Sequence, residues 1–139
     1  MPEKVVKIAK LTTGVLIVFL LLCQLFTFEK FPGILLVVGI NSSMSLVVMI
    51  VLVITELMSL PFFIGMEISR LVVLISRAAG FISLGVMTMI SVIAVVDGAP
   101  TVIFGATLKN VSGLVGVLML AIMWVFLMIA NIPTKKTAK

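Results

Sequence analysis

The chain has no histidine, no tyrosine and a single cysteine (Cys23), and only 11% of its 139 residues are charged. Soluble domains carry about 25% charged residues. Without histidine and with one cysteine, a structural zinc site or a histidine-ligated haem is excluded. Cys23 also has no partner for an internal disulfide. We therefore expect a protein without a metal or other cofactor, whose fold does not depend on an oxidising compartment.

Catalytic constellations are missing as well. Serines and threonines are plentiful, but no histidine exists to activate them, and no lysine or acid recurs beside a serine at a useful depth. Neither the dinucleotide fingerprint nor a P-loop occurs. The net charge of +5 comes from basic residues at the borders of apolar runs rather than from one basic face. The sequence predicts neither an enzyme nor a nucleic-acid-binding protein.

Long apolar runs dominate what is present. Hydrophobic residues make up 63% of the chain, and residues 11–28, 34–55, 78–96 and 114–132 contain no charged side chain. An apolar run of about 18 or more residues can cross the ~30 Å hydrocarbon core of a lipid bilayer as one helix. We predict an all-α integral membrane protein with a single domain, an antiparallel bundle of four transmembrane helices. The spans should cover about 11–28, 34–60, 71–96 and 112–132.

The basic residues predict the orientation of this bundle. If each run crosses once, the segments on the side of the two termini carry Lys4, Lys7, Lys10, Arg70, Arg77, Lys135, Lys136 and Lys139. The other side carries only Lys30 and Lys109. Cytoplasmic connections are rich in Lys and Arg. The asymmetry predicts that the N and C termini both lie in the cytoplasm.

Turn signals separate the runs. Pro32-Gly33 should join the first two spans tightly, because Pro-Gly is typical of turns. Asp97–Pro100 forms a second turn signal, and residues 101–110 should then make a surface connection that is partly helical. Pro61 should kink or end the second span, because its ring removes a backbone donor and clashes with the preceding turn.

Glu56 is the only carboxylic acid close to the predicted bilayer interior, and such an acid is a candidate functional residue. One interpretation is an ion pair with Arg77 or Arg70, while Glu67 also lies within reach of Arg70 on one helical face. The other is a proton or cation path that Glu56 lines together with Asn41 on the same helix. The apolar stretch between Asn41 and Glu56 favours the ion pair.

Small residues recur at a spacing of four in the last two spans. They are Ala79 and Ser83 in the third, and Ser112 and Gly116 in the fourth. This spacing lets helix backbones approach closely in lipid. It predicts packing within the bundle in preference to dimerisation.

The middle of the chain resembles the COPI-associated Golgi tetraspan proteins and the Flower family. The residues that carry this resemblance are Thr55-Glu56-Leu57, Pro61, Arg70, Arg77, Phe81 and Gly85, with Gly14, Phe31-Pro32-Gly33 and Gly39 compatible in the first hairpin. These families are four-span proteins of similar length. The resemblance implies a Golgi or vesicle membrane protein involved in trafficking.

Three classes of function stay open. The first is a non-enzymatic membrane organiser or vesicle-trafficking adaptor that acts through helix–helix contacts. The second is an oligomeric ion channel or transporter that uses Glu56. The third is an accessory subunit of a larger membrane complex. The expected partners are the lipid bilayer and either further copies of the chain or such a complex.

A cysteine introduced at position 2 or at position 138 tests the predicted topology. Both should react with a membrane-impermeant thiol reagent only from the cytoplasmic side, because both termini are expected there. Labelling of either position only from the opposite side would contradict the orientation.

Overall fold

The computed structural model describes residues 2–37, 39–66, 69–104, 107 and 111–132. Within these residues it contains five helices: α1 (Glu3–Phe26), α2 (Phe31–Val37), α3 (Ser42–Ile64), α4 (Arg70–Val96) and α5 (Gly113–Ala130). The described part has no β-strand, so the all-α class is confirmed. Four helices, α1, α3, α4 and α5, are long and apolar enough to cross a membrane.

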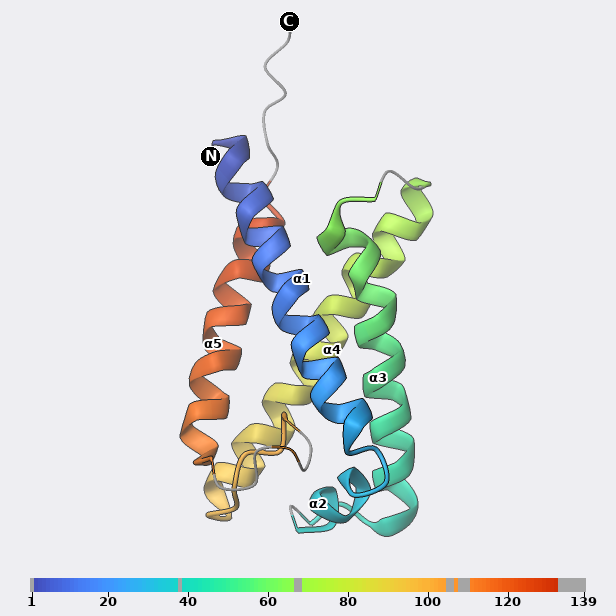
Figure 1. Cartoon of the computed structure of the whole chain (residues 1–139), viewed down its shortest axis with the longest axis vertical. Helices are drawn as coiled ribbons and strands as arrows, with labels where there is room; N and C mark the ends of the chain where they lie inside the picture. Colours follow the sequence, from blue (N-terminus) through green and yellow to red (C-terminus); the bar gives the residue numbers. More distant parts are fainter. Residues whose placement is uncertain (1, 38, 67–68, 105–106, 108–110, 133–139) are drawn as a thin grey trace, which may run out of the picture.

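The four long helices form one bundle (Figure 1). Helix α1 begins and α5 ends at the same end, which we call the upper end as drawn in Figure 1. The short helix α2 lies at the opposite, lower end, where it packs against α3. Helix α3 packs most extensively against α4, and α1 contacts both α3 and α5. The antiparallel order predicted for the long helices is therefore present.

The predicted second span is wrong at its beginning. A continuous helix was expected from Ile34, but α2 ends at Val37 and α3 begins at Ser42. Gly39, with a φ of 81°, adopts the left-handed conformation that glycine tolerates best. The Asn41 carbonyl then accepts the N–H groups of Met44 and Ser45 at 2.9 and 2.8 Å. The polar residues at 41–43 thus mark a helix start, where such residues are favoured.

Helix α3 continues for one turn past Pro61, where an end or a kink was expected, and stops at Gly65 with a φ of 74°. A hydroxyl from α4 bonds to the backbone on both sides of the proline. The Ser76 Oγ accepts the N–H of Phe62 at 2.9 Å and donates to the carbonyl of Ser59 at 2.9 Å. In an apolar environment, neighbouring serines can satisfy backbone groups that a proline leaves free. Ser76 therefore stabilises the backbone of α3 on both sides of its proline.

Phe63 joins three helices near the upper end. A β-carbon at Gly14 of α1 would lie 3.1 Å from the Phe63 Cβ. A β-carbon at Gly80 of α4 would lie 3.1 Å from the Phe63 ring. Phe63 is buried, and its ring also stacks edge-on against Phe62 at a centroid distance of 5.2 Å. The two glycines thus provide the space that this side chain of α3 occupies.

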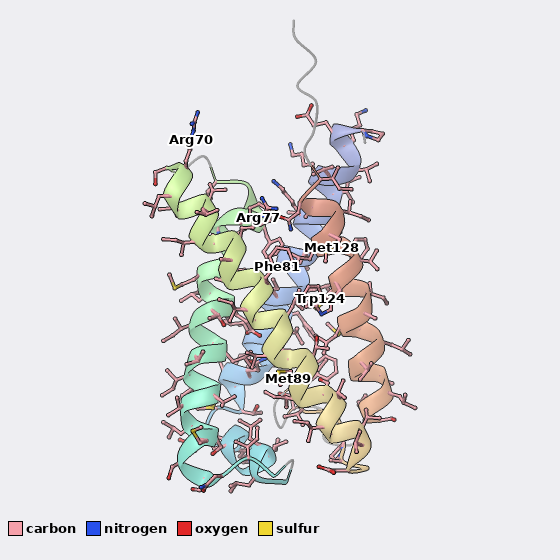
Figure 2. All side chains as sticks on the ribbon, turned by 180° about the vertical axis from the view of Figure 1, so that it is seen from behind. Arg70, Arg77, Phe81, Met89, Trp124 and Met128 are labelled. Carbon is pink, nitrogen blue, oxygen red and sulfur yellow. The ribbon has the colours of Figure 1, made fainter. Side chains whose placement is uncertain are left out.

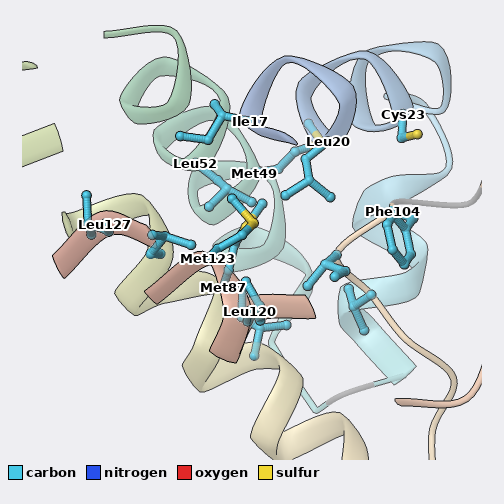
Figure 3. Close-up of a cluster of buried hydrophobic side chains, with 14 of the residues drawn as sticks. Ile17, Leu20, Cys23, Met49, Leu52, Met87, Phe104, Leu120, Met123 and Leu127 are labelled. Atoms are coloured by element: carbon cyan, nitrogen blue, oxygen red, sulfur yellow. The ribbon is translucent and has the colours of Figure 1, made fainter. Parts of the chain in front are cut away.

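The core contains a segment that is not helical. Buried side chains come from α1, α3, α4, α5 and the connection between α4 and α5 (Figure 3). Thr101, Val102, Ile103 and Phe104 of that connection are all at most 5% exposed. The predicted surface connection is therefore wrong for residues 101–104, which we call the inserted segment. Its position is compatible with a membrane only because protein surrounds it.

Replacing Ser76 with alanine tests the hydrogen bonds beside Pro61. The free energy of unfolding should fall by about 1–3 kcal/mol, because a buried N–H of α3 loses its acceptor from α4. Unfolding in mixed detergent micelles, followed by circular dichroism, measures the change. Ser43→Ala is the matched control, since Ser43 is exposed in the first turn of α3. Equal stability of the two variants would contradict the role of Ser76.

Candidate polar site inside the bundle

Glu56 and Gln24 meet inside the bundle. The Gln24 Nε2 donates to Glu56 Oε1 at 3.2 Å and to the backbone carbonyl of Ile103 at 3.2 Å. Glu56 is 1% exposed and Gln24 is fully buried. One amide group therefore connects α1, α3 and the inserted segment. We call Glu56, Gln24 and the Ile103 carbonyl the polar site.

Three further contacts hold the inserted segment beside Gln24. The Phe104 ring lies edge-on to Phe19 of α1, with the centroids 6.2 Å apart. The Thr107 hydroxyl donates to the carbonyl of Cys23 at 3.0 Å. The Thr101 N–H donates to the carbonyl of Val111 at 3.0 Å, which closes the segment into a loop. The carbonyl of Ile103 is thus fixed against α1 by contacts on both sides.

Two oxygen atoms of the polar site have no hydrogen-bond partner among the described residues. They are Gln24 Oε1 and Glu56 Oε2, and both are buried. A buried polar atom without a partner is destabilising, and native proteins keep few of them. The site is therefore an unusual feature of the core, and it can accept one or more additional hydrogen bonds.

The predicted ion pair of Glu56 is wrong in this structure. Glu56 bonds to Gln24, whereas Arg77 and Arg70 are exposed near the upper end of α4 (Figure 2). Neither arginine forms an ion pair with the described acids. Glycine and serine, rather than arginine, face α3 from the buried side of α4. The proposed pair of Arg70 with Glu67 lies outside the described residues, because Glu67 is not among them.

Asn41 does not reach the polar site. It is exposed at the start of α3, at the lower end of the bundle, whereas Glu56 lies about four turns further along the helix. Gln24 and the inserted segment, which do form the site, were not predicted from the sequence. An amide within a long apolar run was the available signal, because such residues commonly hydrogen-bond to a neighbouring helix. Its partners lie 32 and 79 residues away, which sequence spacing does not indicate.

Three of the four predicted packing residues are buried. Ala79 and Ser83 lie on the buried side of α4. Gly116 of α5 is also buried and faces the inserted segment, where a β-carbon at Gly116 would collide with the Thr101 hydroxyl. The prediction is wrong for Ser112, which is exposed. Its hydroxyl instead accepts the N–H of Leu114 at 3.4 Å, as the residue that caps α5.

A groove lies outside the bundle core, between α4 and α5. This groove has a volume of about 440 Å³ and is lined by Gly85, Thr88, Met89, Val92, Ile93 and Trp124. The Trp124 Nε1 donates to the Thr88 hydroxyl at 2.9 Å. With these two polar groups paired to each other, the groove presents an almost entirely apolar wall. Figure 2 shows Met89 and Trp124 on this face.

No family model, curated protein or solved structure matches the chain. The resemblance to Golgi tetraspan and Flower proteins therefore stays a prediction.

Replacing Gln24 with leucine tests the polar site. The free energy of unfolding should fall by about 1–3 kcal/mol, because Glu56 Oε1 and the Ile103 carbonyl both lose their donor. Replacing Glu56 with leucine as well should recover part of the loss, since removing both partners of a buried hydrogen bond costs less than removing one. A double-mutant cycle on unfolding in mixed micelles measures the coupling. Strictly additive losses would contradict the contact between these side chains.

Proposed function

We propose that the chain is an integral membrane protein whose four long helices each cross the bilayer, with both termini in the cytoplasm. The outward sides of these helices support insertion, because they expose large apolar side chains along their length. The upper end supports the orientation. Exposed Lys4, Lys7, Arg70 and Arg77 gather there, and basic residues favour the cytoplasmic side.

Within the membrane, the protein acts without catalysis, through lateral contacts with other transmembrane helices. The groove between α4 and α5 is the observation that carries this proposal. Lipid tails provide no hydrophobic gain for helix association, so helices associate where small residues allow close approach. Gly85 provides such a place, because a β-carbon there would meet nothing within 4 Å. A helix of a second chain can therefore approach α4 along this wall.

The partner in the groove is either another copy of the chain or a subunit of a larger membrane complex. The first makes the protein an organiser, and the second makes it an accessory subunit. A role as a vesicle-trafficking adaptor in the Golgi or in vesicles follows from the family resemblance alone. The groove supports the roles of organiser, accessory subunit and adaptor alike, because each of them requires an accessible apolar face.

A channel or transporter is the second candidate function. The polar site supports it, since acids buried at membrane depth commonly belong to proton or ion pathways. A non-helical segment also reaches the site from the lower end, as in some membrane transport proteins. The nine apolar residues from Leu46 to Ile54 oppose a continuous path along α3. Transport would therefore require groups on other helices.

Replacing Gly85 with phenylalanine tests the lateral-contact proposal. Purified in mild detergent, the wild type should migrate as an oligomer or with co-purifying subunits, and the variant should lose these partners because the ring fills the groove. Native mass spectrometry measures the composition of both. Gly33→Phe is the matched control, since Gly33 also has open space around its β-carbon position but lies on α2.

A wild type that is monomeric and free of partners would contradict lateral contacts. Partners retained by the Gly85 variant would exclude the groove as their binding site. Ion flux into vesicles that depends on Glu56 would favour the transport candidate instead.

A further inference from the structure

The donors of the polar site are fully used. The Gln24 amide carries two N–H groups, and its two acceptors are Glu56 Oε1 and the Ile103 carbonyl. A backbone carbonyl only accepts hydrogen bonds, so the nitrogen of the amide must face Ile103. The amide orientation is therefore fixed by its partner, and the amide oxygen points to the remaining side of the site.

The two atoms left over are both oxygens. Gln24 Oε1 and Glu56 Oε2 belong to the same amide and carboxyl groups that form the Gln24–Glu56 hydrogen bond, so both belong to the polar site. If Glu56 is ionised, both are pure acceptors. The site then lacks a hydrogen for either of them. A single hydrogen on Glu56 Oε2 would turn one acceptor into a donor for the other.

Among the described residues, no positive charge lies beside Glu56 to compensate its ionised form. Helix α5 and residues 101–104 contain no titratable side chain, and Glu56 is the only one on α3. Those of α4 are Arg70 and Arg77, which are exposed. Helix α1 carries Cys23 and, in its first turns, Glu3, Lys4, Lys7 and Lys10, of which Lys10 lies over the Phe62 ring with Nζ 4.5 Å from the centroid. A buried charge without a partner is strongly destabilising.

Metal ions and water fit the site less well than a proton. The described residues contain no group of three His, Cys, Asp or Glu side chains that could hold a metal ion. A cavity beside Ile103 measures about 10 Å³ and is lined by Leu52, Met87, Ile90, Val102 and Ile103. A buried water needs about 10–15 Å³ and two to four polar partners. This cavity has the volume for one water at most, its wall is apolar, and neither Glu56 nor Gln24 lines it.

We propose that the polar site is a proton-binding site, in which Glu56 carries a proton on Oε2 and donates it to Gln24 Oε1. Acid and amide then form a cyclic pair with two hydrogen bonds. In one, Nε2–H of Gln24 donates to Oε1 of Glu56, and in the other, Oε2–H of Glu56 donates to Oε1 of Gln24. The second N–H of Gln24 continues to hold the Ile103 carbonyl. The bound proton therefore contributes to the contact between α1, α3 and the inserted segment. This assignment does not depend on the lateral contacts of the groove.

Infrared spectroscopy of the full chain in lipid vesicles at neutral pH tests the assignment. The wild type should show the C=O stretch of a protonated carboxylic acid, which shifts in deuterium oxide and on labelling of glutamate with carbon-13. Glu56→Gln should abolish this band. A variant with Glu3→Gln, Glu29→Gln and Asp97→Asn should keep it, because these three exposed acids lie outside the site.

Gln24→Leu separates the cyclic pair from a proton held by Glu56 alone. The band should move to higher frequency in this variant, since the acid loses its amide acceptor. An unchanged frequency would overturn the acid–amide pair. Absence of the band in the wild type, or its loss in the variant without the exposed acids, would overturn the proton-binding site. If Glu56→Gln does not fold, the carbon-13 shift together with retention of the band after Glu67→Gln is added to the exposed-acid variant supports the same assignment, because Glu56 is then the one acidic side chain left.

Discussion

The hydrogen bonds of the Gln24 amide connect three parts of the chain, which are α1, α3 and the inserted segment. One N–H reaches Glu56 on α3 and the other reaches the backbone of residue 103. The inserted segment exposes peptide groups to a core that consists otherwise of apolar side chains. Each such group must find a partner within the protein, because neither the core nor lipid supplies one. The arrangement of the lower half of the bundle depends on this constraint.

In the upper half of the bundle, backbone groups also find a partner within the protein, and there the partner is a serine. Pro61 removes a backbone donor from α3, and Ser76 of α4 bonds to the backbone beside it. The same region contains Phe63, which fills the space left by two glycines. The bundle therefore combines two kinds of specific contact. Polar side chains satisfy backbone groups, and small residues make room for one large ring.

The sequence predicted the long helices well and the polar contacts poorly. Length and apolarity depend on local composition, so all four long helices were found, and the ends of α4 and α5 lie within two residues of the predicted ones. Helix α1 begins at Glu3 rather than at residue 11, and residues 34–41 were wrongly joined to the second span. The break between α2 and α3 depends on the left-handed Gly39, whose conformation composition does not reveal. The partner of Glu56 depends on how three distant segments pack. The charge of Glu56 suggested an arginine as its partner, but the buried position of Glu56 is occupied by an uncharged amide, that of Gln24.

The packing of Phe63 against Gly14 and Gly80 ties three positions of the chain to one volume. A methyl group on Gly80 would take space from the Phe63 ring, whereas one on Gly14 would press against the Phe63 β-carbon, which every residue except glycine carries. The cost of alanine at 80 therefore depends on the size of the residue at 63. Related sequences that carry alanine at 80 are expected to carry a smaller side chain at 63, whereas position 14 should stay glycine whichever residue stands at 63.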